Sequence, residues 1–176
     1  KMNITQFMQN NGLPISVKRQ NYVFMQGDAD EHLYAVTSGL LKAYYVSADG
    51  KETVKSFLRP GGVIASFSAA HKKEYCTFNL LALANTELLK MPFSDFYKAA
   101  EESNGIAMEM IGFLLGLSMK KEQREYEFLN LPAEERYQKF AEANPDLVEQ
   151  ITQNDIARYL GITPVALSRI KKRLES

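Results

Sequence analysis

The C-terminal stretch of the chain constrains its fold more than any other part. It predicts two short helices separated by a tight turn, and it reads ITQNDIARYLGITPVALSRIKKRLE. Thr152 and Thr163 are both suited to cap a helix N-terminus, and Asp155 completes a start that resembles a capping box. Gly161 lies where the first helix must end and the chain must turn sharply. Pro164 fits the first position of the second helix, because its missing N–H has no intrahelical partner there.

The second of these helices divides into an apolar and a cationic side. Leu167, Ile170 and Leu174 recur at helical spacing and predict its inner face. The stretch from Ile156 to Leu174 contains no anion, although the whole chain balances 21 basic against 21 acidic residues. Positive charge is therefore local, which is typical of a surface that binds phosphates, and a helix of this size fits the major groove of DNA. The alternative is a solvated amphipathic helix. The cations are Arg158, Arg169, Lys171, Lys172 and Arg173.

Residues 22–91 predict a series of short strands. Ala48-Asp49-Gly50-Lys51 between two β-rich runs is a strong hairpin signal, and Arg59-Pro60-Gly61-Gly62 marks another turn. Seven strands at this spacing predict a β-sandwich, jelly roll or barrel. The seven runs are YVFMQ, HLYAVTSG, LLKAYYVS, ETVKSFL, VIASF, TFNLLAL and ELLKM.

A long apolar helix is predicted after these strands. A short helix from Pro92 to Glu102 comes first, and Ser103-Asn104 begins the next. That next helix is apolar nearly all round, so more than one of its sides must be buried. We expect one side to pack on the β-domain and another on the same helix of a second copy, the alternative being the central helix of a compact monomer. The proposed dimer residues are Ile106, Met110, Phe113 and Leu117.

The chain lacks the residues that several classes of protein need for their function. Cys76 is the single cysteine and the two histidines, His32 and His71, are 39 positions apart, so the ligand set of a cupin-type metalloenzyme is missing. No Ser-His-Asp or Cys-His arrangement is apparent, so we expect no enzyme, metal or cofactor. The longest apolar stretch spans about 14 residues where a membrane helix needs about 20, and no secretory signal is present. We expect a cytoplasmic protein that does not bind membranes.

Over essentially its whole length, the chain resembles the Crp/Fnr family of bacterial transcription regulators. The resemblance implies an α+β protein of three parts: a cyclic-nucleotide-binding-like β-roll (jelly-roll) sensor at 1–103, a dimerisation helix at 104–130 and a helix-turn-helix DNA-binding domain at 131–176. Family members continue into a β-hairpin wing, which we expect to be truncated, minimal or absent here. The matching segments are GD at 27–28, HLYAVTSGL at 32–40, DGKE at 49–52, FLRPG at 57–61, LPAEER at 131–136, LGITP at 160–164 and LSRI at 167–170.

The resemblance also implies a set of DNA-binding residues. Arg169 is the expected guanine reader, because its planar guanidinium matches O6 and N7 together. Phosphate contacts are expected from Thr152, Gln153, Asn154, Thr163, Lys171, Lys172 and Arg173, and base-edge contacts from Pro164, Val165, Ala166 and Arg169. The implied partners are double-stranded DNA carrying a pseudo-palindromic operator, a second copy of the chain, RNA polymerase and an unidentified small-molecule effector.

The β-roll departs from the pattern of family members that bind cyclic AMP. Those members carry a Gly-Glu pair in one region and an Arg-Ser or Arg-Thr pair in another. This chain reads VIASF at 63–67 and EYCT at 74–77 in these regions, with neither the acid of the first pair nor the arginine of the second. Burying a phosphate without a cation is costly, so we expect no cyclic AMP binding in the usual manner. A ligand-sensing or protein-interaction module without DNA binding is the alternative function. The expected effector pocket consists of Ile64, Ala65, Ser66, Tyr75, Cys76 and Thr77.

Overall fold

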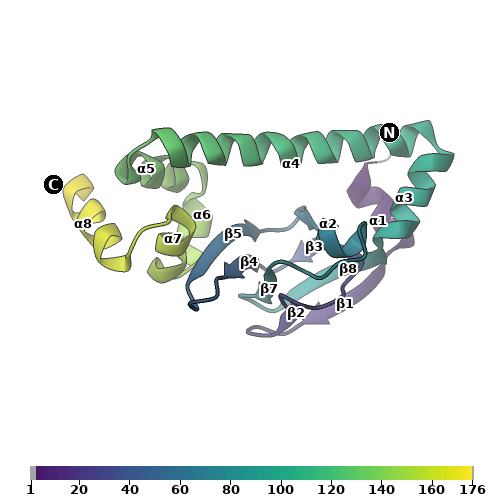
Figure 1. Ribbon diagram of the computed structural model, residues 1–176, viewed down its shortest axis with the longest axis horizontal. Helices are drawn as coiled ribbons and strands as arrows, with labels where there is room; N and C mark the ends of the chain where they lie inside the picture. The colour runs from purple at the N-terminus through teal and green to yellow at the C-terminus, as the bar shows by residue number, and fades with distance from the viewer. Residues whose placement is uncertain (1–2, 176) are drawn as a thin grey trace. The chain divides into compact units, whose positions relative to one another are not determined.

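The computed structural model describes residues 3–175, which contain eight helices and eight strands, with the strands in the N-terminal half and mostly helices after them (Figure 1). Residues 1, 2 and 176, which the predicted sensor and DNA-binding domains include, lie outside the described part. The chain divides into two compact units, residues 1–115 and 116–176. The division falls inside the long helix α4 (Asn104–Asn130), so one continuous helix belongs to both units.

The N-terminal unit is a β-roll made of two antiparallel sheets, which confirms the predicted fold class. Each sheet combines strands that are far apart in the sequence, as expected for a roll and not for a simple meander. One sheet has the order β1 (Leu13–Val17), β8 (Thr86–Pro92), β3 (His32–Ser38) and β6 (Val63–Ile64). The other has the order β2 (Tyr22–Phe24), β7 (Asn79–Ala82), β4 (Leu41–Val46) and β5 (Glu52–Leu58).

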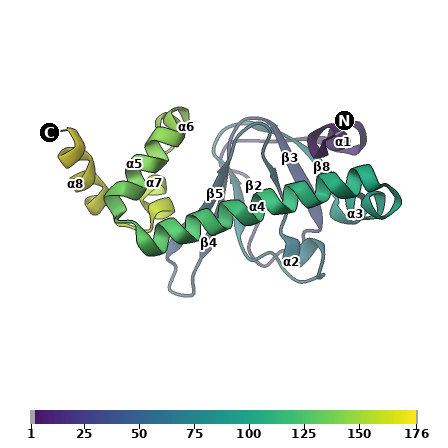
Figure 2. The same ribbon diagram turned by 90° about the horizontal axis from the view of Figure 1, so that it is seen from above.

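Two apolar clusters stabilise this unit. The first joins side chains of both sheets, among them the fully buried Leu41 and Leu88. The second covers the opposite side of β3 and β8, where α1 (Ile4–Asn11), α3 (Phe93–Glu102) and the first turns of α4 gather (Figure 2). Phe96 of α3 and Met110 of α4 are buried in it. The central strands β3 and β8 of this sheet therefore carry buried side chains on both faces.

Most of the predicted turns are confirmed. The hairpin between β4 and β5 closes with Gly50 N–H donating to the Ser47 carbonyl at 2.9 Å. Gly62 N–H donates to the Arg59 carbonyl at 2.9 Å in the second predicted turn. Four elements were not predicted: α1, β1, the short helix α2 (Phe67–Ala70) and the short helix α6 (Pro145–Gln150). The predicted strand VIASF is wrong beyond Ile64, because the chain turns into α2 there.

The long helix has the bounds that were predicted for it, residues 104–130. Ser103 precedes it, and its hydroxyl accepts from Ile106 N–H at 3.5 Å. Helix α5 (Ala133–Ala143) follows after Pro132, with Glu134 and Glu135 in its first turn. Acidic side chains there are favourable, because unpaired N–H groups give a helix N-terminus partial positive charge.

Two glycines with left-handed backbone angles give a matched test of the roll. Gly39 has φ +93, and a Cβ there would lie 2.4 Å from Thr86 Oγ1 and 2.6 Å from the Asn85 carbonyl. Gly50 has φ +80 with nothing within 4 Å of its Cβ position. We expect Gly50→Ala to lower the free energy of unfolding by about 1–2 kcal/mol, the cost of left-handed backbone. Gly39→Ala adds a steric cost of about 1–3 kcal/mol. Urea unfolding of both variants measures the difference, and equal losses would contradict this description of the turn.

Candidate nucleic-acid interface

The two C-terminal helices have the caps and the turn that were predicted for them. Helix α7 (Gln153–Leu160) begins after Thr152, whose hydroxyl accepts from Asp155 N–H at 3.1 Å. Gly161 ends it with φ 70, in the left-handed region. Helix α8 (Pro164–Glu175) begins after Thr163, whose hydroxyl accepts from Ala166 N–H at 3.1 Å. Both helix starts and the sharp turn are therefore built from local side-chain chemistry.

Apolar packing determines which side of α8 faces outward. Leu167 and Ile170 are buried, as are Ile156 and Leu160 of α7. The prediction that Leu174 completes this inner face is wrong, because its side chain is 37% exposed. Leu174 lies one residue before α8 ends, beyond the two turns that the core covers. The buried contact is therefore made by the first two turns of α8.

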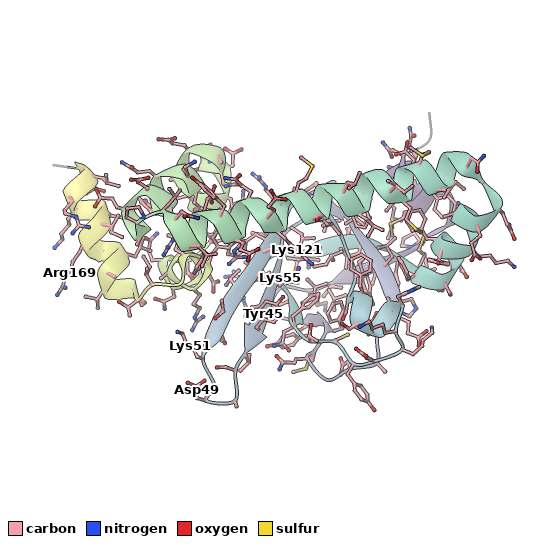
Figure 3. All side chains as sticks on the ribbon, turned by 45° about the horizontal axis from the view of Figure 1, so that its top comes forward. Tyr45, Asp49, Lys51, Lys55, Lys121 and Arg169 are labelled. Atoms are coloured by element: carbon pink, nitrogen blue, oxygen red, sulfur yellow. The ribbon has the colours of Figure 1, made fainter. Side chains whose placement is uncertain are left out.

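The outward side of α8 combines cations with one apolar residue. Val165, Ser168, Arg169 and Lys172 are all exposed, Val165 by 61%. Within residues 3–175, Arg169 and Lys172 have no hydrogen-bond or ion-pair partner, and Figure 3 shows the Arg169 side chain extending from the helix into solvent. Ser168 was not among the predicted site residues, although its position three residues after Val165 and four before Lys172 places it on the same face.

Two of the predicted phosphate-binding cations contact neighbouring helices instead of remaining free. Lys171 Nζ donates to Gln153 Oε1 at 3.1 Å, so α8 is joined to α7. Arg173 Nη2 lies 2.8 Å from Glu134 Oε2, so α8 is also joined to α5. These contacts engage both flanks of α8 and leave its central cations available. The other predicted contacts Thr152, Asn154, Thr163 and Pro164 are exposed, and Ala166 is half-buried.

The expected effector pocket is only partly assembled. Ile64, Ala65, Ser66 and Cys76 are buried, and Ile64 and Cys76 belong to the core between the sheets. Tyr75 and Thr77 are exposed, Tyr75 by 69%, so the structure does not bring them together with the other four. Alternation along the extended segment 75–77 places Cys76 inside and its neighbours outside.

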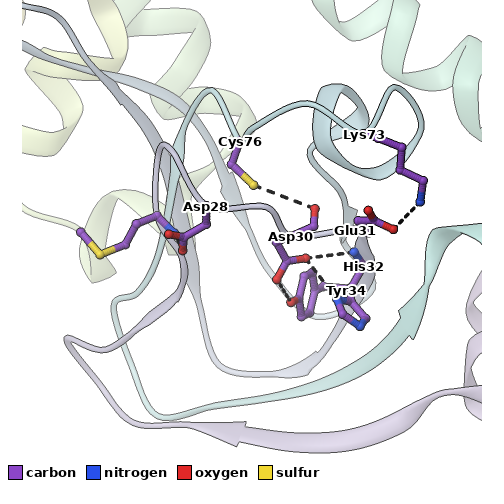
Figure 4. A network of polar contacts seen from close by, with 8 residues as sticks. Asp28, Asp30, Glu31, His32, Tyr34, Lys73 and Cys76 are labelled. Carbon is purple, nitrogen blue, oxygen red and sulfur yellow. Dashed lines mark hydrogen bonds and ion pairs between the residues drawn. The ribbon is translucent and has the colours of Figure 1, made fainter.

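A polar network is centred on Asp30, and Cys76 contacts it through one weak hydrogen bond from Sγ to the Asp30 carbonyl (Figure 4). The Asp30 carboxylate accepts from the Tyr34 hydroxyl at 2.7 Å and from His32 N–H at 2.9 Å. Burial and this acidic partner raise the pKa of Tyr34 far above its ordinary value, so the phenol stays protonated. Lys73 pairs with Glu31 at the edge of the network. His32 is the first residue of β3, and the Asp30 carboxylate binds its backbone N–H.

Neither a metal site nor a membrane helix is apparent in the described residues. Among residues 3–175, no three His, Cys, Asp or Glu side chains are grouped so that they could hold a metal ion. No helix in the same range is long and apolar enough to cross a membrane.

The placement of α4 changes which of its residues are available to a partner. Met110 is buried and Ile106 packs in the core of the N-terminal unit, while the Phe113 ring centroid lies 6.4 Å from that of Phe67. Leu117 is half-buried. Three of the four predicted dimer residues therefore contact other side chains of the N-terminal unit. The exposed apolar residues of the helix are Met108, Ile111, Leu114, Leu115, Met119, Tyr126, Phe128 and Leu129.

The described elements define a class of protein in which a β-roll is followed by a long helix and a helix-turn-helix. A family model described as "Cyclic nucleotide-binding domain" matches residues 14–103. An anaerobic regulatory protein of Pasteurella multocida is 28% identical over 172 residues, which are 90% of this chain and 62% of that protein. The transcriptional activator protein Anr of Pseudomonas protegens is 27% identical over 172 residues, 90% of this chain and 69% of that protein.

The structure of FixK2 from Bradyrhizobium japonicum has the same fold, with a TM-score of 0.78 at 20% identity over 93% of this chain and 84% of that one. The chain belongs to the cyclic nucleotide-binding domain family, and the relatives to which it is similar are bacterial regulatory proteins. It spans only about two thirds of the length of the regulators to which it is similar, 62% for the Pasteurella multocida protein.

The buried cysteine gives a prediction about reactivity. Burial raises the pKa of the Cys76 thiol, which lowers its thiolate fraction at neutral pH, and the side chain is also shielded from solvent. We expect a disulfide reagent at pH 8 to modify the native protein at least about tenfold more slowly than the urea-unfolded chain. One equivalent of reagent should react after unfolding, because the chain has one cysteine. Equal rates in both states would show that the thiol is accessible.

Proposed function

We propose that this chain is a homodimeric, sequence-specific DNA-binding regulator of transcription. The observation that carries the proposal is the outward face of α8, where Arg169 and Lys172 are exposed opposite the buried Leu167 and Ile170. A helix supported from behind by a second helix, with cations on its free side, has the geometry that enters a major groove.

The residues on this face have distinct proposed roles. Arg169 donates to guanine O6 and N7 through its planar fork, and Val165 contacts a thymine methyl group. Ser168 adds a hydroxyl that can donate or accept at a neighbouring base. Lys172 contacts the phosphate backbone, as do the exposed groups at the helix starts, Thr152, Asn154 and Thr163. Arg173 is not included among the proposed phosphate contacts, because its side chain is paired with Glu134.

The second copy is proposed to pack on the exposed stripe of α4. Met108, Ile111, Leu115 and Met119 follow one another at spacings of 3, 4 and 4, so they share one side of the helix. Gly112 and Gly116 leave open space where a Cβ would be, which permits close approach of another helix. Exposed apolar stripes of this length are typical of helix pairs, and a two-fold pair places its two recognition helices on successive major grooves.

The β-roll is proposed to sense an effector other than cyclic AMP bound in the usual manner. Among residues 3–175, Ser66 and Cys76 are buried, no arginine is buried, and Tyr75 is exposed. A buried phosphate needs a cation or several donors. DNA and RNA polymerase are the proposed macromolecular partners, which places the protein in the bacterial cytoplasm.

Variants on the outward face test the DNA-binding role. We expect Arg169→Ala to cost about 1–3 kcal/mol on the preferred site and to relax discrimination at one base pair. Lys172→Ala should weaken binding to all sequences alike and reduce the slope of log affinity against log salt by about one. Fluorescence anisotropy on labelled duplexes at several salt concentrations measures both effects.

Lys139→Met is the control for loss of one positive charge, because Lys139 is exposed on α5 and lies outside the proposed contacts. Affinity of the unaltered chain that does not change with salt would refute DNA binding through phosphates. An unchanged base preference in Arg169→Ala would remove this residue from the reading role.

Dimerisation has its own matched pair of variants. We expect Leu115→Glu to shift the protein toward a monomer, because the charge would enter the apolar contact between two helices α4. Leu13→Glu should leave the mass in solution unchanged, since Leu13 is a similarly exposed leucine on an edge strand of the roll. Sedimentation equilibrium measures the mass. A monomeric unaltered chain, or the same dimer in both variants, would contradict the proposed contact.

A further inference from the structure

The last carbonyl groups of α7 are bound by arginines from two other helices. A helix ends with carbonyls that lack intrahelical partners and carry partial negative charge. At the end of α7, the N–H groups of Gly161 and Ile162 both donate to the Ala157 carbonyl. The carbonyls of Tyr159 and Leu160, which come immediately before the turn, accept from Arg124 and Arg136 instead.

Arg124 reaches this site from α4. Its Nη2 donates to the Tyr159 carbonyl at 3.0 Å, and its guanidinium carbon lies 4.3 Å from the centroid of the Tyr159 ring. The same side chain therefore makes a charged hydrogen bond and a cation–π contact with one residue of α7. Tyr159 packs in turn on Phe140 of α5, with ring centroids 4.9 Å apart.

Arg136 of α5 joins the ends of two helices. Its Nη2 donates to the Leu160 carbonyl at 3.0 Å, and its Nη1 donates to the Leu131 carbonyl at 3.1 Å. Leu131 follows directly after α4, so one planar guanidinium connects the end of α4 with the end of α7. Lysine cannot reproduce this arrangement, because it lacks a rigid fork of donors.

Phe128 is partly exposed, and its ring also contacts Arg136 and the backbone of the turn. The Arg136 guanidinium carbon lies 4.6 Å from the Phe128 ring centroid. A Cβ on Gly161 would lie 2.7 Å from Cζ of Phe128, so the ring packs directly on the backbone of the turn. The turn leads within two residues to Thr163, where α8 begins.

We propose that Arg124 and Arg136 are positioning residues that set the orientation of the recognition turn, and with it of α8, relative to the C-terminal end of α4. This inference rests on the proposed function, because α4 is there the helix that forms the dimer. If two helices α4 meet at a fixed axis, the orientation of α8 against α4 determines the separation and rotation of the two half-sites. The two arginines then act on the spacing of the operator without contacting DNA.

The experiment measures the dependence of affinity on half-site spacing. The probe is the duplex that the unaltered chain selects from a random pool, together with versions in which the half-sites are one base pair closer or farther apart. One base pair rotates a half-site by about a tenth of a turn, so the unaltered chain should discriminate strongly between these duplexes. We expect Arg136→Met to bind the selected duplex about tenfold more weakly and to lose most of this discrimination.

Arg124→Met should have the same effect, and Arg124→Lys should restore most of the spacing preference, because lysine can still donate to the single carbonyl of Tyr159. Arg136→Lys should not restore it, because that site needs a fork. A merely stabilising role would lower the melting temperature in each variant and leave the spacing preference of the folded fraction unchanged. If Arg136→Met does not fold, the comparison of Arg124→Met with Arg124→Lys decides.

Lys139→Met on α5 is the control for the loss of one positive charge. This variant should keep the preference of the unaltered chain for the selected half-site spacing. Binding to a random duplex, and its salt dependence, should be the same in all variants, because the proposed phosphate contacts are intact. Unchanged spacing discrimination in both methionine variants would overturn this inference while leaving the proposed function in place. An unaltered chain that selects no duplex would instead overturn the proposed function.

Discussion

The burial of one side of α8 against α7 is the contact on which the C-terminal unit depends. Leu167 and Ile170 are almost fully removed from water by Ile156 and Leu160. Each such side chain contributes about 1.5–3 kcal/mol when buried, whereas turning α8 over would bury unpaired cations at far greater cost. The same packing that stabilises the unit therefore forces Arg169 and its neighbours outward. The exposure of the proposed DNA-binding face of α8 therefore follows from core packing.

The long helix α4 makes contacts in both units. In the N-terminal unit it contributes Met110 to the apolar cluster on the outer side of β3 and β8. In the C-terminal unit it contributes Arg124 and Phe128 to the contacts around the turn between α7 and α8. Its exposed apolar side is the surface proposed for the second copy. Helix α4 thus contributes side chains to the contacts of each of the two units.

Local chemistry made much of this structure predictable from sequence. The caps at Thr152 and Thr163 and the end of α7 at Gly161 depend on residues within one helical turn, so pattern alone identifies them. Long-range contacts were not predictable in this way. Which side of α4 faces the roll depends on the position of Phe67, and the partners of Arg124 and Arg136 lie 35 and 24 residues away. Leu174 and Tyr75 have apolar or aromatic character, but only the surrounding fold determines that they are exposed.

The most direct test of the account is selection of bound duplexes from a random pool by the full chain, followed by sequencing. The account predicts enrichment of two inverted copies of one short motif, with centres about one helical turn or 34 Å apart, because two identical recognition helices related by a two-fold axis meet successive major grooves. A conserved guanine within each copy is expected opposite Arg169. Recovery of a pool without enrichment, or of a single motif lacking its inverted copy, would contradict the central claim that paired helices α8 read DNA.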